Sequence, residues 1–401
     1  MNGVSIRYGD KVIPRDEIKS VKITQEYDPL SLSLIISTAD IEISTRDKGQ
    51  YNFVREVPFY VFFDDELKIV AYLDTKKSES KTKIKVSAED FIGRLEDFTF
   101  GGDVYSGINA KELIDDIMKD TGIPYTVDVG FNNMSVSGRI PYTNCREALA
   151  HVLFATGGVT KPQPEYSVST GIGKLVIGFN DEGNVESIPE NRTLQGVKVE
   201  QEEQITGVEV TAHKYARDAV QKTLHSFTSE EIKYPGKTTL MFEPPVYRLY
   251  IAQNETTGAG EIVAQSANFA DIKFKSPYEF NLYGYEYIPS SIVDGIYAET
   301  ATRPKIYAIE DKTLVNGRNS QEVLQRCFDY YSKNTKATAK IVEGKHYNGD
   351  KAISGIQYDS KLHVGQIVTI PTEDSGFYTG RILKQKYSLN GNIIIKEITI
   401  K

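Results

Sequence analysis

The stretch IPYTNCREALAHVLFATGGV, residues 140–159, is the clearest landmark in this chain. Asn144 or Thr143 can cap a helix there, and Glu147 lies three residues after Asn144, as a capping box requires. Apolar residues then recur at helical spacing until the glycine pair at 157–158, which ends the helix. This stretch therefore predicts one well-defined helix in a chain whose remaining pattern mostly indicates strands and turns.

The overall composition is that of a folded globular protein. The 401 residues are 40% hydrophobic and 25% charged, and the length favours two to four domains. The formal net charge of -8 argues against a dedicated duplex-DNA binder, which needs a basic surface. We therefore expect no sequence-specific binding of nucleic acid, although DNA could still pass over such a surface.

The two cysteines, Cys145 and Cys327, do not suggest a disulfide framework or a zinc site made of cysteine alone. Both occur on the apolar side of predicted helices, so we expect buried free thiols. The first 20 residues contain charges where a signal peptide needs an apolar run, and no segment has the ~20 apolar residues of a membrane helix. We expect a protein made in the bacterial cytoplasm, which leaves the cell by lysis or as part of a particle.

Residues 1–98 have the alternation of period two that antiparallel strands show, for example at Val21 and Ile23 and again at Leu32, Leu34 and Ile36. Such strands with short turns predict a sandwich or a small barrel. The segment Lys76–Lys81 (KKSESK) has the composition of a hairpin tip. It is either a solvated turn or a basic contact patch made by Lys76, Lys77 and Lys81.

Residues 99–192 predict a small α+β domain. Asn109 can cap a helix with Glu112 as its capping-box partner, and Gly122 ends that helix. Its stripe of leucine and isoleucine is expected to be core.

Residues 193–250 and 305–401 return to a strand pattern and predict a second β module. It contains a helix that Asn319 can cap, and the dipeptide Asn390-Gly391 predicts a final hairpin. The segment 251–304 is a predicted insert rich in tyrosine. Tyr283, Tyr285 and Tyr287 suit an interface, because tyrosine gives amphipathic contact area, or they simply pack on a β surface.

A search for catalytic chemistry finds no strong signal. None of the five histidines has a local metal-ligand spacing, and no nucleophile elbow, P-loop or dinucleotide fingerprint is present. Acidic pairs such as Asp64-Asp65 and Glu202-Glu203 could serve a cell-wall hydrolase, but turn solvation explains them as well. We therefore expect no enzyme, no cofactor and no metal. A carbohydrate-binding adhesin or receptor-binding tail protein is the other alternative; it lacks tryptophan but has 25 tyrosines.

Several stretches, taken in order, resemble the tail hub proteins of phages of Gram-positive bacteria. The landmark helix resembles their REAL…FA.GG helix, and ELIDDIMKDTGI (112–123) fits the same layout. The sequence ITGVEVTAHKY (205–215) resembles the strand after their central domain. Their closing segment is similar to three stretches, NSQEVLQRCFDYYSKNTKATAKIV (319–342), VGQIVTIPT (364–372) and GFYTGRILKQKYSLNGNIIIKEITI (376–400).

The resemblance implies the baseplate hub of contractile tails, a family related to the hub part of type VI secretion spikes. It implies an α+β, mainly β fold, with two tail-tube-like antiparallel β-barrel domains and an inserted small α+β domain. Three chains would form a homotrimeric ring whose six barrels match the six-fold tail tube and whose other end holds a trimeric central spike. The implied partners are the tail tube protein or a tube initiator, the spike and other baseplate proteins. The particle would be a phage virion or a phage-tail-like bacteriocin, and the hub would have no enzymatic role.

Overall fold

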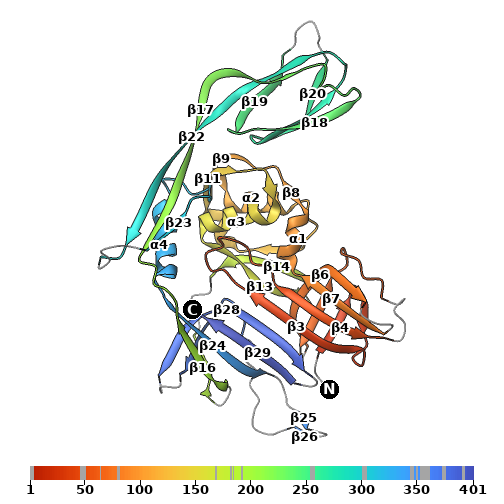
Figure 1. Ribbon diagram of the computed structural model, residues 1–401, viewed down its shortest axis with the longest axis vertical. Helices are drawn as coiled ribbons and strands as arrows, with labels where there is room; N and C mark the ends of the chain where they lie inside the picture. Colours follow the sequence, from red (N-terminus) through yellow and green to blue (C-terminus); the bar gives the residue numbers. More distant parts are fainter. Residues whose placement is uncertain are drawn as a thin grey trace.

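The computed structural model describes residues 4–45, 51–63, 65–78, 82–167, 169–180, 183, 185–190, 193–252, 258–299, 305–343, 347–348, 351–352, 362–372, 376–390 and 393–401. Strands predominate, and the prediction of a mainly β, α+β fold is confirmed. Three layers follow the long axis in Figure 1: a large sheet, a helical layer, and a bent β arm above it. Within the described residues no helix has the length and apolarity needed to cross a membrane.

The N-terminal module is built from seven antiparallel strands. They are β1 (Val4–Tyr8), β2 (Lys11–Ile13), β3 (Ile18–Glu26), β4 (Thr38–Ser44), β5 (Phe59–Phe63), β6 (Glu66–Ser78) and β7 (Lys83–Glu89). β4 and β7 bury every second residue, as the period of two predicts. The long strand β6 pairs with β5 through its first half and with β7 through its second half, so the sheet folds around one core.

One segment of this module differs from the sequence prediction. Leu32, Leu34 and Ile36 alternate, but they lie in an irregular segment, and β4 begins only at Thr38. The Asp28 carboxylate accepts hydrogen bonds from the backbone N–H groups of Leu30 and Ser33, at 2.9 and 3.3 Å. This local turn uses donors that a strand would give to its neighbour.

The C-terminal module continues the same sheet. Its strands are β15 (Glu186–Ser187), β16 (Thr193–Gln201), β24 (Thr335–Glu343), β27 (Ile367–Pro371), β28 (Phe377–Asn390) and β29 (Ile393–Ile400). A separate short pair is formed by β25 (Tyr347–Asn348) and β26 (Lys351–Ala352). β28 and β29 form the final hairpin that the sequence predicted.

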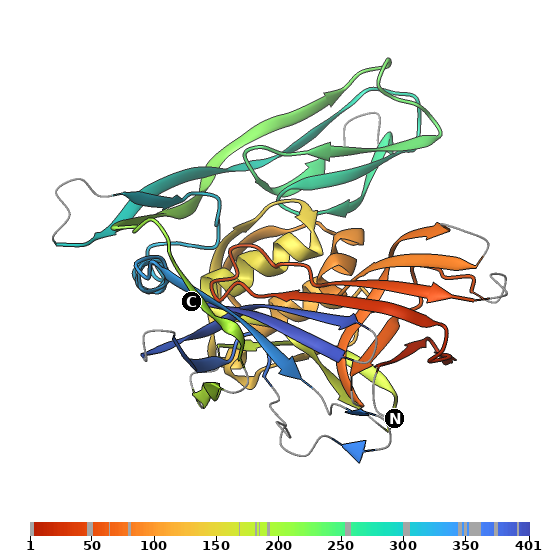
Figure 2. The same cartoon turned by 60° about the horizontal axis from the view of Figure 1, so that its bottom comes forward.

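A seam joins the two modules. β28 pairs with β3, so that Gln385 lies opposite Gln25 and Tyr387 opposite Ile23. Among the described residues, 13 strands therefore form one sheet, which runs from β16 at one end to β2 at the other. Figures 1 and 2 show these modules side by side, with the sheet continuous between them.

The helical layer covers one side of the sheet. It contains two short helices, α1 (Phe91–Arg94) and η2 (Leu95–Asp97), followed by β8 (Thr99–Phe100), β9 (Asp103–Asn109), α2 (Ala110–Met118), β10 (Tyr125–Val127), η3 (Val129–Asn133), β11 (Ser135–Ile140), β12 (Thr143–Asn144), α3 (Cys145–Thr156), β13 (Gly158–Ser167) and β14 (Ile172–Phe179). The side chains of Asn109 and Asn144 cap α2 and α3, and Gly157 ends α3 at φ 73°. Both predicted helices are thus present.

The arm is a long ribbon that rises from the body. β17 (Gly207–Phe227) pairs with β22 (Phe280–Tyr297) along nearly its whole length, with β19 (Val246–Ile251) and β23 (Ile306–Ile309) added at opposite ends. α4 (Ser320–Tyr331) packs under the lower end. A second sheet of β18 (Gly236–Met241), β21 (Phe269–Phe274) and β20 (Gly260–Gln265) completes the arm's upper end.

The strand pairing cuts across the domain boundaries that the sequence suggested. Of the predicted second module, β16, β24, β27, β28 and β29 belong to the large sheet, whereas β17, β18 and β19 belong to the arm. The strands of the predicted insert, β20, β21 and β22, lie in the arm with them. The N-terminal strands, predicted as a separate barrel in 1–98, share their sheet with the C-terminus. Alternation tells which face of a strand is buried but not which strand lies beside it, so the sequence could not reveal either pairing.

Candidate assembly surfaces

The predicted lysine tip does not form one patch. Lys76 and Lys77 are consecutive in β6, so their side chains point to opposite faces of the sheet. The Lys76 ammonium donates to the carbonyl of Tyr51 at 2.8 Å and lies 5.4 Å from the centre of the Phe53 ring. Lys77 faces a groove on the outer side of the sheet. Lys81 lies outside the described residues.

This groove has a volume of about 450 Å³ and crosses β3, β4, β7 and β6. Lys22, Lys77 and Lys85 line it together with Asp40 and Glu42. Lys83 pairs with Glu42 at 2.9 Å, and the Ser87 hydroxyl donates to Asp40 at 2.9 Å. The groove is therefore polar and of mixed charge.

The same mixture of charges continues across the seam. Lys384 of β28 pairs with Glu26 of β3, and Lys386 lies 3.4 Å from Glu397. On the outer face of the sheet, acidic partners thus neutralise several of the lysines locally. Exposed ion pairs of this kind add little to the stability of the fold, so their main effect is on the polarity of the surface.

The three predicted tyrosines share one face of β22, where they pack on tyrosines of β19. Tyr285 stacks on Tyr247 with ring centres 5.3 Å apart, and Tyr283 stacks on Tyr250 at 5.7 Å. Tyr287 lies 5.1 Å from Tyr247 and is 7% exposed. Sequence reasoning did not single out the β19 partners. Tyr247 and Tyr250 are three residues apart and reach the same face only through a register shift between them, which alternation does not predict.

These tyrosines brace a bend in the arm. Arg217 pairs with Tyr287 and Gln221 with Tyr285, so three residues of β17, 218–220, bulge opposite a single residue of β22. Such a bulge bends its strand. The Tyr247 hydroxyl donates to the backbone carbonyl of Asp218 in the bulge. The tyrosine cluster therefore has an internal structural role, and any contact with another chain stays a prediction.

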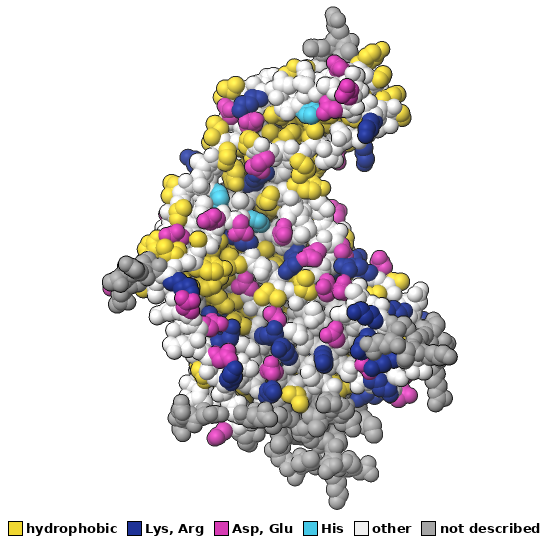
Figure 3. Space-filling view, in the orientation of Figure 1, with side chains coloured by type: hydrophobic (Ala, Val, Ile, Leu, Met, Phe, Trp, Pro, Cys, Tyr) yellow, Lys and Arg dark blue, Asp and Glu magenta, His cyan; other side chains and the backbone are white. Residues whose placement is uncertain are grey.

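A strip of exposed apolar side chains follows the lower half of β22. Ile288, Ile292, Val293 and Tyr297 are 52%, 72%, 59% and 47% exposed. In Figure 3, hydrophobic side chains appear along this flank of the arm. Within the described residues, β22 has no partner strand here on the side away from β17. Exposed apolar edges of this kind are typical of interaction sites.

The groups that could support catalysis have structural partners. Glu202 pairs with Lys336 at 2.7 Å and with Lys401 at 2.8 Å, and these hydrogen bonds lower the pKa of its carboxyl. Glu203 pairs with Lys305. Asp64 lies outside the described residues. In the part of the chain that the structure describes, no three His, Cys, Asp or Glu side chains gather into a metal site.

Both cysteines are buried and free, as predicted. Burial raises the pKa of the Cys145 thiol to about 11 and that of Cys327 to about 12. Neither is a reactive thiolate at neutral pH.

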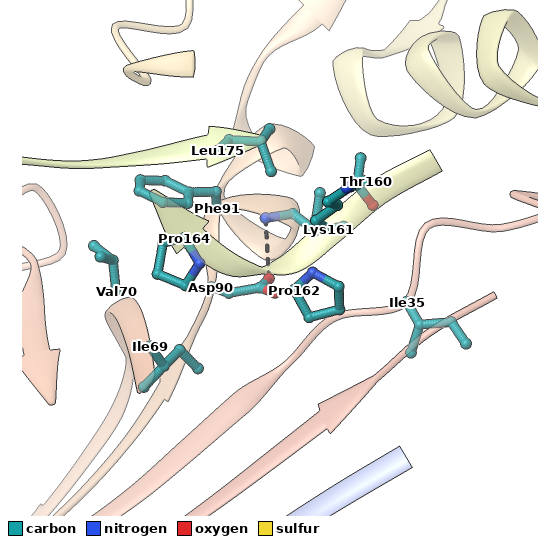
Figure 4. Close-up of a pocket in the computed structure, with 11 residues that line it drawn as sticks. Ile35, Ile69, Val70, Asp90, Phe91, Thr160, Lys161, Pro162, Pro164 and Leu175 are labelled. Atoms are coloured by element: carbon teal, nitrogen blue, oxygen red, sulfur yellow. Dashed lines mark hydrogen bonds between the residues drawn. The ribbon is translucent and has the colours of Figure 1, made fainter. Parts of the chain in front are cut away.

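The most perturbed carboxyl belongs to Asp90, beside the small cavity in Figure 4. Burial raises its pKa to about 6, although the carboxylate accepts backbone hydrogen bonds from Ser37, Ile92 and Gly93. A shifted carboxyl in a cleft can mark an active site. This cavity of about 10 Å³ has room for a single water at most, and Asp90 caps α1. Its role is therefore structural.

No family model and no curated protein matches this sequence. Solved structures do match. A tail protein from Neisseria meningitidis MC58 is 12% identical, with a TM-score of 0.59 over 100% of this chain and 96% of that one. The 43 kDa tail protein of prophage MuSo2 from Shewanella oneidensis is 12% identical, with a TM-score of 0.55 over 100% and 98%. Prophage tail protein gp18 from Listeria monocytogenes EGD-e is 10% identical, with a TM-score of 0.50 over 99% and 94%.

The chain thus has the fold of phage tail proteins over its whole length, and the resemblance noted in the sequence is confirmed at the level of the fold.

Proposed function

We propose that this protein is the structural baseplate hub of a phage or phage-tail-like particle. In this proposal three copies form a ring that adapts the six-fold tail tube to a three-fold central spike. The tail tube protein or a tube initiator binds one end of the ring, the trimeric spike binds the other, and further baseplate proteins bind outside. The protein is made in the cytoplasm, becomes part of the particle, and catalyses no reaction.

The observation that carries the proposal is the seam between β3 and β28. Through it, each chain presents two β modules in one continuous sheet. Three copies then supply six modules, the number that a six-fold tube requires. The sheet ends at β16 and at β2, so a cyclic arrangement can bring the β16 end of one copy to the β2 end of the next, which is a heterologous contact.

The charge of the sheet's outer face also supports this role. Lysines of β28 pair with glutamates of β3 and β29, which offsets part of their positive charge. A DNA duplex that passes along such a face would release fewer counterions than it would over unpaired lysines.

The test is the mass of the purified protein in solution, alone and co-expressed with its spike partner. We expect three copies of the 44.9 kDa chain in at least one condition, which is about 135 kDa for the protein alone and correspondingly more with the spike bound. Val199 on β16 and Val12 on β2 are 46% and 68% exposed, and aspartate at either position should abolish that species. Val129 lies on the helical layer and is 76% exposed, so Val129→Asp is the matched control.

A monomer in both conditions would refute the ring. Glycan binding, as expected of an adhesin, would then be the next assay. The predicted contact residues have their own test. If Lys76→Ala, Lys77→Ala and Tyr285→Ala leave trimer formation and tube seeding intact, these side chains are not ring contacts.

A further inference from the structure

The arm touches the helical layer at a second place, far from its base. The side chain of Asn268, in the loop before β21, is 1% exposed and uses its whole amide group. Its Nδ2 donates to the carbonyls of Gly101 and Ile140 at 2.9 and 2.8 Å, and its Oδ1 accepts from Arg139 Nε at 2.8 Å. One asparagine thus joins the arm to two loops of the body.

Arg139 completes this contact from the body side. Its guanidinium pairs with Glu243 of the arm at 2.8 Å and donates to the carbonyl of Phe242 at 3.4 Å. Next to it, the Phe269 ring packs edge-on against Tyr142, with centres 5.3 Å apart. We call the group of Arg139, Asn268, Glu243, Tyr142 and Phe269 the latch.

Gly102 lets the two surfaces approach this closely. Its φ is +60°, and a Cβ at this position would lie 2.1 Å from the Ile140 carbonyl oxygen and 2.8 Å from Asn268 Nδ2. Only glycine tolerates both the left-handed backbone and the contact.

Beside the latch, the Ser266 hydroxyl donates to the Gly101 carbonyl at 3.2 Å, and the Ala267 N–H donates to the Asp103 carboxylate. The ribbon is the other described connection between the upper arm and the body.

At the lower end the His213 N–H donates to the Val315 carbonyl, and at the upper end the Tyr287 N–H donates to the Pro245 carbonyl, both at 2.8 Å. Between these two tethers the arm consists of β17 and β22 alone, near residues 214–216 and 288–290. A two-stranded ribbon has little stiffness or stability of its own. The latch itself is small and mostly polar, and water can replace its hydrogen bonds when it opens.

We infer that the arm is a hinged element, which the latch holds in a docked position and which swings on the two-stranded ribbon when the latch opens. Opening uncovers the Arg139 guanidinium, the Gly101 and Ile140 carbonyls, and the Tyr142–Phe269 pair. The inference concerns the single chain and does not depend on its assembly into a ring.

The experiment measures the distance between arm and body by spin-label spectroscopy on the full chain. Labels are attached at Val129→Cys on the body and Met241→Cys on the arm, which are 76% and 56% exposed in the native protein. The native thiols at 145 and 327 are buried and stay unlabelled. The latch-breaking variant combines Asn268→Ala with Arg139→Met. Asn281→Ala is the matched control, because this arm asparagine donates only within the arm, to Tyr283.

We expect one narrow distance in the native protein and in the control. The latch-breaking variant should show a longer, broader distribution, with at least a roughly tenfold rise in the ratio of released to docked arms. Glu243→Gln, which weakens only the rim pair, should give a smaller shift in the same direction.

An unchanged distance in the latch-breaking variant would overturn the inference, because the arm would then stay docked without the latch. Hydrogen exchange supplies the second readout. The arm's core, which includes Phe227, Phe274 and Phe280, should stay protected. Loss of that protection would also overturn the inference, since the arm would unfold rather than swing.

Discussion

Tyr387 is the side chain whose replacement should most clearly test the seam between the modules. It is 1% exposed and lies on β28, directly opposite Lys396 of β29. The Lys396 and Lys68 ammonium groups lie 5.1 and 5.5 Å from the centre of its ring, and the Phe63 ring lies edge-on at 5.6 Å. Its hydroxyl donates to Gln385 Oε1 at 2.9 Å. One ring therefore contacts two buried cations at the place where the modules join.

Two substitutions separate these interactions. Tyr387→Phe removes only the hydroxyl and leaves Gln385 Oε1 without that donor, which should cost about 1 kcal/mol of unfolding free energy. Tyr387→Leu also removes the ring. The two cation–ring contacts contribute ~1–2 kcal/mol each when desolvated, and the aromatic pair adds ~1 kcal/mol. The total expected for Tyr387→Leu is about 4–6 kcal/mol.

A double-mutant cycle with Lys396→Met isolates the contact between this ring and one cation. We expect a coupling of ~1–2 kcal/mol between Tyr387→Leu and Lys396→Met. The chain contains no tryptophan, so urea unfolding is best followed by circular dichroism. Hydrogen exchange in β3 and β28 then shows whether the seam itself opens. A coupling below ~0.3 kcal/mol would mean that the ring does not stabilise the buried ammonium, and the reasoning would fail.

Three further changes have defined outcomes. Gly102→Ala should destabilise the protein by ~3 kcal/mol or more in thermal unfolding, because its Cβ would strike the Ile140 carbonyl within the body and also crowd Asn268 of the arm. Gly107→Ala, with φ +76° and open space, should cost only ~1 kcal/mol. Burial lowers the pKa of His151 from 6.5 to about 4. The corresponding contribution to the free energy of unfolding, about 3 kcal/mol, is fully present above pH 6.5 and is lost as pH falls through 4. His151→Leu should remove this loss from the plot of unfolding free energy against pH. Burial raises the pKa of Asp90 from 3.8 to about 6. The corresponding contribution to the free energy of unfolding, about 3 kcal/mol, is fully present below pH 3.8 and is lost as pH rises through 6. Asp90→Asn should remove that decline from the same plot.

The controls for these changes come from the chain itself. Equal losses for the two glycine variants would show that backbone conformation, and not the clash, sets the cost. Between pH 4 and 6 the His151 and Asp90 effects on the free energy of unfolding have opposite signs. The stability of the native protein should therefore change little with pH on account of these two residues. If neither single variant alters the slope there, the two pKa shifts are not linked to folding.

The fold was predictable where its causes are local. Asn109 and Asn144 lie directly before apolar stripes, and a capping side chain needs only neighbours in sequence to act. The final hairpin likewise follows from two alternating strands around a short turn. The alternation at Leu34 was misleading, because the Asp28 turn satisfies the backbone there and Leu34 packs into the helical layer instead.

The candidate surfaces were less predictable. The tyrosines of β22 stood out by composition, but their stacking on Tyr247 and Tyr250 depends on a strand register that the sequence does not state. Asn268 and Arg139 carry no signal in the sequence, since a single buried amide and a single guanidinium look like any other polar residues until the chain brings them together.

By itself the sequence determined the fold class, the main helices and the resemblance to tail hubs, because helix caps, stripes and alternation act within a few residues. Only the tertiary structure decided that β3 and β28 join the ends of the chain in one sheet, and that the arm bends back onto the helical layer. Backbone hydrogen bonds between strands are chemically the same for every pair, so the choice of partner depends on how all the buried faces pack together, which no local pattern contains.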